Sequence, residues 1–262
     1  MRSGATILLS SLLLTAAATA DDPEVGVSDQ PCRGVPVQPT VAHKASADPY
    51  QSWMHDWLSL DWGQLCRYQP ENAALPPATH ARVIFLGDSI TEGWKNLQPE
   101  FFGPERLDRG ISGQTTGQML VRFRADVIDL HPAVVQIMAG TNDIAGNSGP
   151  TSLAIIQENI ASMAEQARAH GAQVIIASIL PAARFGWRPQ LQPAAAIAAM
   201  NEWLQSYAAR EHYIYVDYYA ALNDGHGGIK AALANDGVHP NAAGYAVMRP
   251  LAEAALRQAL AR

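Results

Sequence analysis

The sequence has few basic residues, and they form no run. Lysine and arginine total 18 against 24 aspartate and glutamate residues, which gives a net charge of −6 with histidine neutral. Proteins that bind nucleic acid or an anionic lipid surface do so chiefly through clustered lysine and arginine. The composition therefore argues against both as partners.

Long hydrophobic runs are also absent after the first 20 residues, since no later segment approaches the roughly 18 apolar residues of a membrane span. Residues 1–20 combine the basic Arg2, a short apolar run and the small residues Ala18-Thr19-Ala20. That pattern is typical of a signal peptide cleaved before Asp21. A membrane anchor is the alternative, but the run is short and no cysteine follows it to carry a lipid. We expect a periplasmic or secreted protein with no membrane partner after cleavage.

Cysteine is scarce, and the only two are Cys32 and Cys66. An exported chain meets an oxidising compartment, where such a pair commonly forms a disulfide. We therefore predict a disulfide between them, which the loop-entropy model values at about 3 to 4 kcal/mol. Two buried free thiols are the alternative.

The chain of 262 residues, with 48% hydrophobic residues, is long enough for one main domain. Residues 21–80 form an N-terminal extension, whose part 48–75 carries tryptophans at helical spacing and predicts a helical arm. The arm is interpreted as a lid packed on the main domain, with a sugar-stacking surface as the alternative. Pro76-Pro77 marks the boundary with a domain over 81–262.

From residue 81, short apolar segments alternate with longer helical patterns. The expected strands are 82–86, 134–138, 173–180 and 213–216. The expected helices cover about 116–129, 152–170, 192–210 and 243–261, and a further helix begins just after Ser89. This alternation predicts an α/β protein of three layers, with a central parallel sheet between helices.

Four short segments contain the chemically useful residues: 87–91, 110–116, 140–143 and 236–240. In open α/β sheets the ligand crevice lies beyond the carboxyl ends of the strands, which is where the first three segments fall. The fourth is a turn-rich loop in which an aspartate precedes a histidine by three residues.

These segments supply every part of an acyl-transfer site. Ser89 is the candidate nucleophile, His239 the base that takes its proton, and Asp236 the carboxylate that orients the imidazole. The candidate oxyanion donors are the backbone N–H groups of Ser89 and Gly113 and the side-chain amide of Asn142.

With these residues in this order, the chain resembles the SGNH (GDSL-type) serine hydrolases over roughly residues 82–260. The resemblance implies the flavodoxin-like fold of that family, ester hydrolysis through an acyl-enzyme and no cofactor. Residues 109–116 are most similar to the branch of platelet-activating-factor acetylhydrolases and bacterial carbohydrate acetylesterases. That similarity implies a short acyl group, above all acetyl.

Each site residue also fits an ordinary structural role: serine caps helices, glycine permits positive φ, asparagine bonds its own turn and histidine lies in loops. Taken together, these alternatives require four coincidences. The Gly-x-Ser-x-Gly elbow of α/β-hydrolases is absent around Ser89. We assign the neighbouring Asp88 and Asp143 to holding loops through backbone N–H groups. His226 has no second ligand at a metal-like spacing, so no metal site is expected.

The sequence therefore predicts an exported serine esterase acting on short-chain esters of a small molecule or a polysaccharide. Trp94, Phe185 and Trp187 are candidate walls of the substrate pocket. A lysophospholipase or arylesterase with the same machinery is the nearer alternative. A non-catalytic carbohydrate-binding module is the distant one.

Overall fold

The computed structural model describes residues 61–77 and 81–262, together with Cys32. The expected signal peptide and most of the N-terminal extension, including Trp53 and Trp57, lie outside the described residues. Cys32 and Cys66 are disulfide-bonded, as predicted. No helix in the described ranges combines the length and apolarity needed to cross a membrane.

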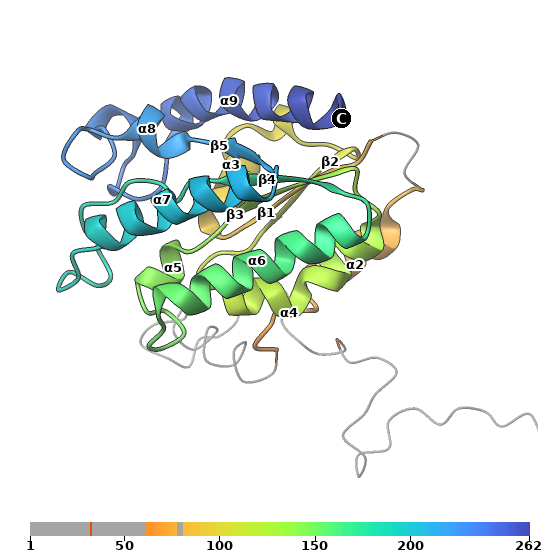
Figure 1. Cartoon of the computed structure of the whole chain (residues 1–262), viewed down its shortest axis with the longest axis horizontal. Coiled ribbons are helices and arrows are strands. Elements are labelled where there is room, and N and C mark those ends of the chain that lie inside the picture. The colour runs from red at the N-terminus through yellow and green to blue at the C-terminus, as the bar shows by residue number, and fades with distance from the viewer. Residues whose placement is uncertain (1–31, 33–60, 78–80) are drawn as a thin grey trace, which may run out of the picture. The chain divides into compact units, whose positions relative to one another are not determined.

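A five-stranded parallel sheet forms the centre of the described part (Figure 1). Its order is β2-β1-β3-β4-β5, the flavodoxin-like arrangement. The strands are β1 (Val83–Gly87), β2 (Arg106–Gly110), β3 (Val134–Met138), β4 (Gln173–Ala177) and β5 (Ile214–Val216). This sheet confirms the predicted fold class.

Helices cover both faces of the sheet, with α4, α6 and α7 on one face and α3, α8 and α9 on the other (Figure 1). Successive side chains of a strand point to opposite faces. Ile84 and Leu86 of β1 therefore join the first core, while Val83 and Phe85 join the second. The helices are α2 (Gln69–Ala74), α3 (Ser89–Leu97), α4 (Thr116–Asp126), α5 (Thr141–Ile144), α6 (Leu153–Ala169), α7 (Ala194–Arg210), α8 (Tyr218–Leu222) and α9 (Ala242–Leu260). Three 3-10 turns also occur: η1 (Pro99–Phe101), η2 (Ile128–Leu130) and η3 (Ala231–Leu233).

The expected elements agree with the observed ones to within a few residues. The helix expected over 116–129 ends earlier, at Asp126, and continues as η2. The strand expected over 173–180 ends at Ala177. The last three residues of the expected strand leave the sheet and begin the loop toward α7, which carries the candidate pocket residues Phe185 and Trp187.

The edge strand β2 was not predicted, because its sequence Arg-Leu-Asp-Arg-Gly lacks the apolar character of a buried strand. Two of its charged side chains, Asp108 and Arg109, are buried, and each makes at least one hydrogen bond within the fold. Arg109, 1% exposed, donates two hydrogen bonds to Asn72 Oδ1 of α2. Tyr68 donates to the Gly110 carbonyl on the open edge of the strand. These bonds satisfy polar groups that an edge strand would otherwise expose.

Candidate active site

Ser89 lies at the junction of β1 and α3, at the carboxyl edge of the sheet. Asp88 is the N-cap of α3, where its Oδ1 accepts the N–H of Ile90 at 2.9 Å. The strand turns into the helix tightly, since a Cβ on Gly87 would lie 2.0 Å from the Thr91 hydroxyl. The turn therefore requires glycine, and it presents Ser89 at a helix N-terminus, where developing negative charge is favoured.

His239 meets the nucleophile from the loop that precedes α9. Its Nε2 lies 2.9 Å from Ser89 Oγ, although 150 residues separate the two in the chain. Its Nδ1 lies 2.6 Å from Asp236 Oδ2. A carboxylate only accepts hydrogen bonds, so Nδ1 carries the proton and Nε2 is free to accept the serine hydroxyl.

Asp236 is held by its own turn. Its Oδ1 accepts the N–H groups of Val238 and His239 at 2.9 and 2.8 Å. Partial burial raises the pKa of Asp236, but these bonds and the His239 ring outweigh burial and leave the pKa below its ordinary value. Asp236 therefore stays ionised, as an acceptor for Nδ1 must.

The candidate oxyanion donors gather at the same edge. Gly113 adopts φ +79°, which favours glycine, and a Cβ there would meet nothing within 4 Å. Asn142 of α5 is buried, and its Nδ2 donates to the carbonyl of Gln114 at 3.0 Å and to Asp88 Oδ2 at 3.2 Å. The amide nitrogen is thus turned toward the residue that follows Gly113 and the one that precedes Ser89.

Asp88 and Asp143 hold loops through backbone N–H groups, as assigned from the sequence. Asp143 accepts both the N–H and the hydroxyl of Thr116, at the first turn of α4. Burial raises the pKa of Asp88 to about 6 and also raises the pKa of Asp143. The hydrogen bonds of these two carboxylates go to other groups, whereas Asp236 accepts a hydrogen bond from His239 Nδ1.

The prediction that Trp94 lines the substrate pocket is wrong. Trp94 is 0% exposed and stacks between Phe101 and Tyr245 in the core on the α9 side of the sheet. Its position on α3, five residues after Ser89, turns the ring away from the sheet edge and into the protein. A position close to a site residue in the chain does not fix the direction of the side chain.

Phe185 and Trp187 share the loop between β4 and α7, but only one of them reaches the surface. Phe185 is 0% exposed, whereas Trp187 is 42% exposed and stacks on it at 5.1 Å. The Trp187 ring centroid lies 6.3 Å from that of His239. Trp187 is therefore an exposed aromatic ring beside His239 and remains a candidate pocket wall, and the buried Phe185 packs behind it.

Two residues that were not predicted from the sequence, Glu92 and Arg122, connect the segments that carry the candidate site residues through hydrogen bonds. Glu92 of α3 accepts the N–H of Ser112 at 2.9 Å, next to Gly113. Arg122 of α4 is fully buried and donates to the carbonyls of Gly87 and Arg109, at the ends of β1 and β2. These partners lie far apart in the sequence, so no local pattern could have indicated them.

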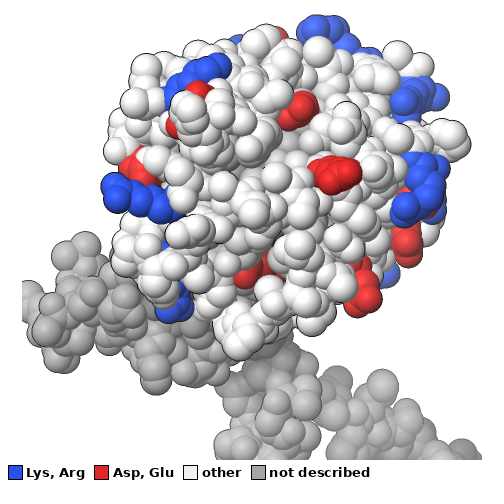
Figure 2. All heavy atoms as spheres, turned by 60° about the vertical axis from the view of Figure 1, so that its left-hand side comes forward, with Lys and Arg blue, Asp and Glu red and all other residues white. Residues whose placement is uncertain are grey.

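A cavity of about 440 Å³ lies beside Asp236, whereas Ser89 and His239 are not among its lining residues. Arg184 of the β4–α7 loop, Asp224, Asp236 and Gly237 are among its lining residues. Figure 2, with the left-hand side of Figure 1 turned forward, shows a mostly uncharged face with some Asp and Glu side chains across it and the Lys and Arg side chains mainly toward its rim. Such a face suits an uncharged ester better than a polyanion.

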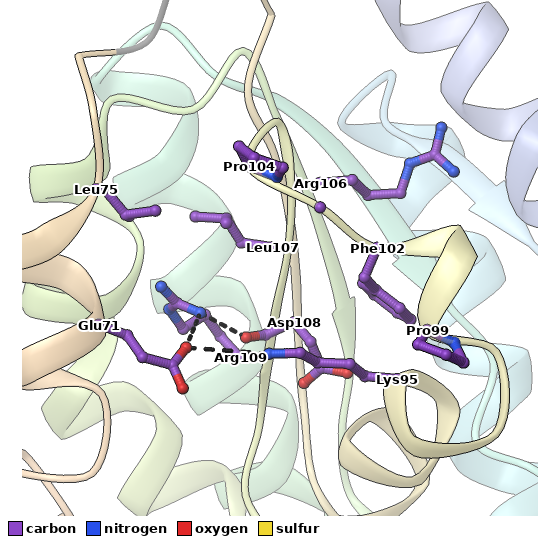
Figure 3. Close-up of a pocket in the computed structure, with 11 residues that line it drawn as sticks. Glu71, Leu75, Lys95, Pro99, Phe102, Pro104, Arg106, Leu107, Asp108 and Arg109 are labelled. Carbon is purple, nitrogen blue, oxygen red and sulfur yellow. Dashed lines mark hydrogen bonds and ion pairs between the residues drawn. The ribbon is translucent and has the colours of Figure 1, made fainter.

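A separate cavity of about 240 Å³ lies at the β2 edge (Figure 3). Glu71 forms ion pairs there with Lys95 and Arg109, at 4.0 and 3.5 Å. None of the candidate site residues lines this cavity. Within residues 61–77 and 81–262, no group of three or more His, Cys, Asp or Glu residues is arranged to hold a metal ion.

Comparison with known proteins found a family model, a relative and solved structures that are similar to this chain. The model of the GDSL-like lipase/acylhydrolase family matches residues 85–247. Esterase TesA of Pseudomonas aeruginosa is 32% identical over 171 residues, which cover 60% of this chain and 79% of that protein. A GDSL-like lipase from Bacteroides thetaiotaomicron superposes with a TM-score of 0.74 at 42% identity, over 76% of this chain and all of that one. An acetylxylan esterase from Geobacillus stearothermophilus shares the fold, with a TM-score of 0.55 at 20% identity over 68% of this chain and 94% of that one.

Proposed function

The chain belongs to the GDSL-like lipase/acylhydrolase family and is a carboxylic ester hydrolase, and we propose that it releases short acyl groups through an acyl-enzyme on Ser89. The observation that carries the proposal is the continuous line from Ser89 Oγ through the His239 ring to Asp236, with contacts of 2.9 and 2.6 Å. A serine hydroxyl is a weak nucleophile until such a base takes its proton.

In the first half-reaction, His239 Nε2 takes the proton of Ser89 as Oγ bonds to the ester carbonyl carbon. The N–H groups of Ser89 and Gly113 and the amide of Asn142 donate to the resulting oxyanion. Asn142 releases its longer bond, the one of 3.2 Å to Asp88, to make this contact. The ester C–O bond then breaks, and His239 gives its proton to the leaving alcohol.

In the second half-reaction, water takes the place of the alcohol. His239 removes a proton from the water as its oxygen bonds to the acyl carbon, and the second tetrahedral intermediate uses the same donors. Collapse breaks the bond to Ser89 Oγ, which regains a proton from His239. The acid leaves, and the enzyme returns to its starting state.

We propose acetyl as the acyl group and a carbohydrate as the alcohol. The resemblance of residues 109–116 to carbohydrate acetylesterases supports the acyl part. The half-exposed Trp187 ring beside His239 supports the alcohol part, because His239 protonates the leaving alcohol and aromatic faces pack against sugar rings. The signal-like pattern of residues 1–20 supports a location outside the cytoplasm, where an enzyme can meet polysaccharide.

Ser89→Ala tests the mechanism, and Ser152→Ala is its control. We expect Ser89→Ala to lower kcat by at least about 10³-fold, because the nucleophile is lost. Ser152 caps α6 on an exposed surface, accepting the N–H of Ile155, so its loss should cost about 1 kcal/mol of stability and leave kcat unchanged. Undiminished hydrolysis by Ser89→Ala would refute the mechanism.

A series of acetyl, butyryl and octanoyl esters of one leaving group tests the acyl preference. We expect kcat/KM to be highest for acetyl. Faster turnover of octanoyl esters would instead support a lysophospholipase-like activity. Acetylated xylan, acetylated pectin, cell-wall glycans and aryl acetates, compared at equal acetyl concentration, then test whether carbohydrate is the preferred alcohol.

A further inference from the structure

Asn147 lies in the turn after α5 and uses both ends of its side-chain amide. Its Nδ2 donates to Asn142 Oδ1 at 2.7 Å. Its Oδ1 accepts the indole N–H of Trp187 at 3.1 Å. The turn is closed by a further bond, from the Asn147 N–H to the Asn142 carbonyl at 3.0 Å. Asn147 thus bridges the candidate oxyanion donor and the exposed ring of Trp187.

The orientation of the Asn142 amide decides whether it can stabilise an oxyanion. The two ends of a side-chain amide have nearly the same shape, but only the nitrogen end donates. In the observed orientation Nδ2 faces Asp88 and the Gln114 carbonyl. The reverse orientation would turn Oδ1 toward the Asp88 carboxylate and bring the amide nitrogens of Asn142 and Asn147 together. The bond from Asn147 therefore selects the orientation that catalysis needs.

Trp187 fixes the orientation of Asn147 in turn. An indole N–H only donates, so the amide end of Asn147 that faces Trp187 must be its oxygen. The donors consequently run in one direction: from Trp187 to Asn147, from Asn147 to Asn142, and from Asn142 to Asp88 and Gln114. Reversing any one amide breaks the bonds on both sides of it.

We infer that Asn147 is a positioning residue that orients the Asn142 amide as an oxyanion donor and couples this orientation to Trp187, the exposed ring beside His239. The inference rests on the proposed function, in which Asn142 donates to the oxyanion. Asn147 itself touches no reacting atom. Its effect should therefore appear in the chemical step and not in substrate binding.

The main test replaces Asn147 with Ala and, separately, with Asp. Loss of an oxyanion donor costs about 10²- to 10³-fold in kcat, so a donor that is only misoriented should cost less, about 10-fold, with KM within about 3-fold. Asn147→Asp keeps the size and an acceptor for Trp187 but removes the donor to Asn142, so it should lower kcat at least as much as Ala. The control is Ser148→Ala, in the same turn as Asn147. The Ser148 hydroxyl donates to Gln118 of α4 and forms no hydrogen bond with Asn142 or Trp187, so kcat should be unchanged.

Two further measurements separate positioning from general damage to the fold. A trifluoromethyl ketone forms a hemiketal oxyanion with the active serine, so its Ki should rise in both Asn147 variants by about the factor by which kcat falls. Trp187→Phe keeps an aromatic ring, although a smaller one, and removes the indole N–H. It should lower kcat less than Asn147→Ala does, and the double variant should be no slower than Asn147→Ala alone.

The outcomes distinguish this inference from the function on which it rests. If Ser89→Ala and Asn142→Ala abolish or sharply lower kcat while both Asn147 variants keep full kcat and Ki, the proposed function stands and the positioning role is refuted. If Asn142→Ala is fully active, the oxyanion assignment fails, and the role of Asn147 fails with it. Additive losses in the double variant would refute the coupling to Trp187.

Discussion

Asp108 shows what burial does to a single carboxyl group in this protein. It lies on β2 with 2% of its surface exposed, and its Oδ1 accepts the N–H of Gly110 at 2.7 Å. Its Oδ2 has no hydrogen-bond partner within the described residues. Burial raises the pKa of Asp108 to about 7, against the smaller opposing effects of the Gly110 N–H and Lys95. The folded protein therefore favours the protonated form of this group.

A stability dependence on pH follows from Asp108. Its pKa is higher in the folded state than the value of about 4 in the unfolded chain, so the stability it contributes is present below about pH 4 and is lost as the pH rises through about 7. Asp108→Asn keeps an acceptor for Gly110 and removes the buried charge. We expect the variant to be more stable than the parent at about pH 8, by about 1 to 3 kcal/mol, and to show little gain at about pH 4.

Urea denaturation at both pH values measures this difference. Asp129→Asn is the control, because Asp129 is 58% exposed and only pairs with Arg124 at the surface. Its effect should be small at either pH. An Asp108→Asn variant that is less stable than the parent at about pH 8 would show that the ionised carboxylate has a stabilising partner.

The types of the candidate oxyanion residues could be predicted from the sequence, but the contacts that orient them could not. The types of residue in the four segments indicated the chemistry, because an acyl-transfer site needs a nucleophile, a base, an acid and N–H donors. The contacts of Asn147 were not predicted, since an asparagine in a Gly-Asn-Ser-Gly turn fits a loop equally well. Only the direction of its side chain shows that it bonds Asn142 and Trp187.

At the scale of elements, capping residues set where the helices begin. Asp88, Ser152 and Asn241 each accept N–H groups in the first turns of α3, α6 and α9. The apolar pattern alone predicted most helix starts to within two residues, and these caps occur at starts so predicted. The edge strand β2 has no such apolar pattern, because its sequence is largely charged. Its burial depends on hydrogen bonds and an ion pair between Arg109 and residues of α2, which are distant in the sequence.

Helix α9 contains a proline that weakens it. Pro250 lies in the interior of α9, is exposed and cannot donate a hydrogen bond to the carbonyl of Ala246, one turn earlier. An interior proline costs a helix about 3 kcal/mol relative to alanine, partly offset by the lower entropy of the unfolded chain. We therefore expect Pro250→Ala to raise the free energy of unfolding by about 1 to 2 kcal/mol.

Urea denaturation with an unchanged m-value checks this prediction. Pro99→Ala is the matched control, because Pro99 begins η1, where proline is favourable and its replacement should bring no gain. If Pro250→Ala instead loses stability, a bend at Pro250 helps α9 to follow the sheet.

At the scale of the described part as a whole, stability concentrates in the centre of the sheet. Strands β1 and β3 are fully buried and each is paired on both sides. Helix α2 has no buried residue. Opening the central strands requires most of the structure to unfold, whereas α2 needs only local opening.

Hydrogen exchange should reveal this gradient. We expect the amides of β1 and β3 to exchange at least about 100-fold more slowly than those of α2, because their opening approaches the global unfolding reaction. Mass spectrometry of peptic fragments measures both regions in one experiment. Equal rates in β1 and α2 would mean that the sheet does not form the cooperative core.

The fold class and the family could be predicted from the sequence alone, because alternating apolar strands and helices and short ordered motifs are properties of neighbouring residues. The spacing of Asp236 and His239 is equally local, since a turn of four residues can bring the two side chains together. Three features depend on the tertiary structure: His239 meets Ser89 across 150 residues, Trp94 is buried in the core, and Trp187 is exposed beside His239. The reason is physical: local patterns record the backbone geometry of a few residues, whereas the direction and partners of a side chain depend on what packs against it from elsewhere in the chain.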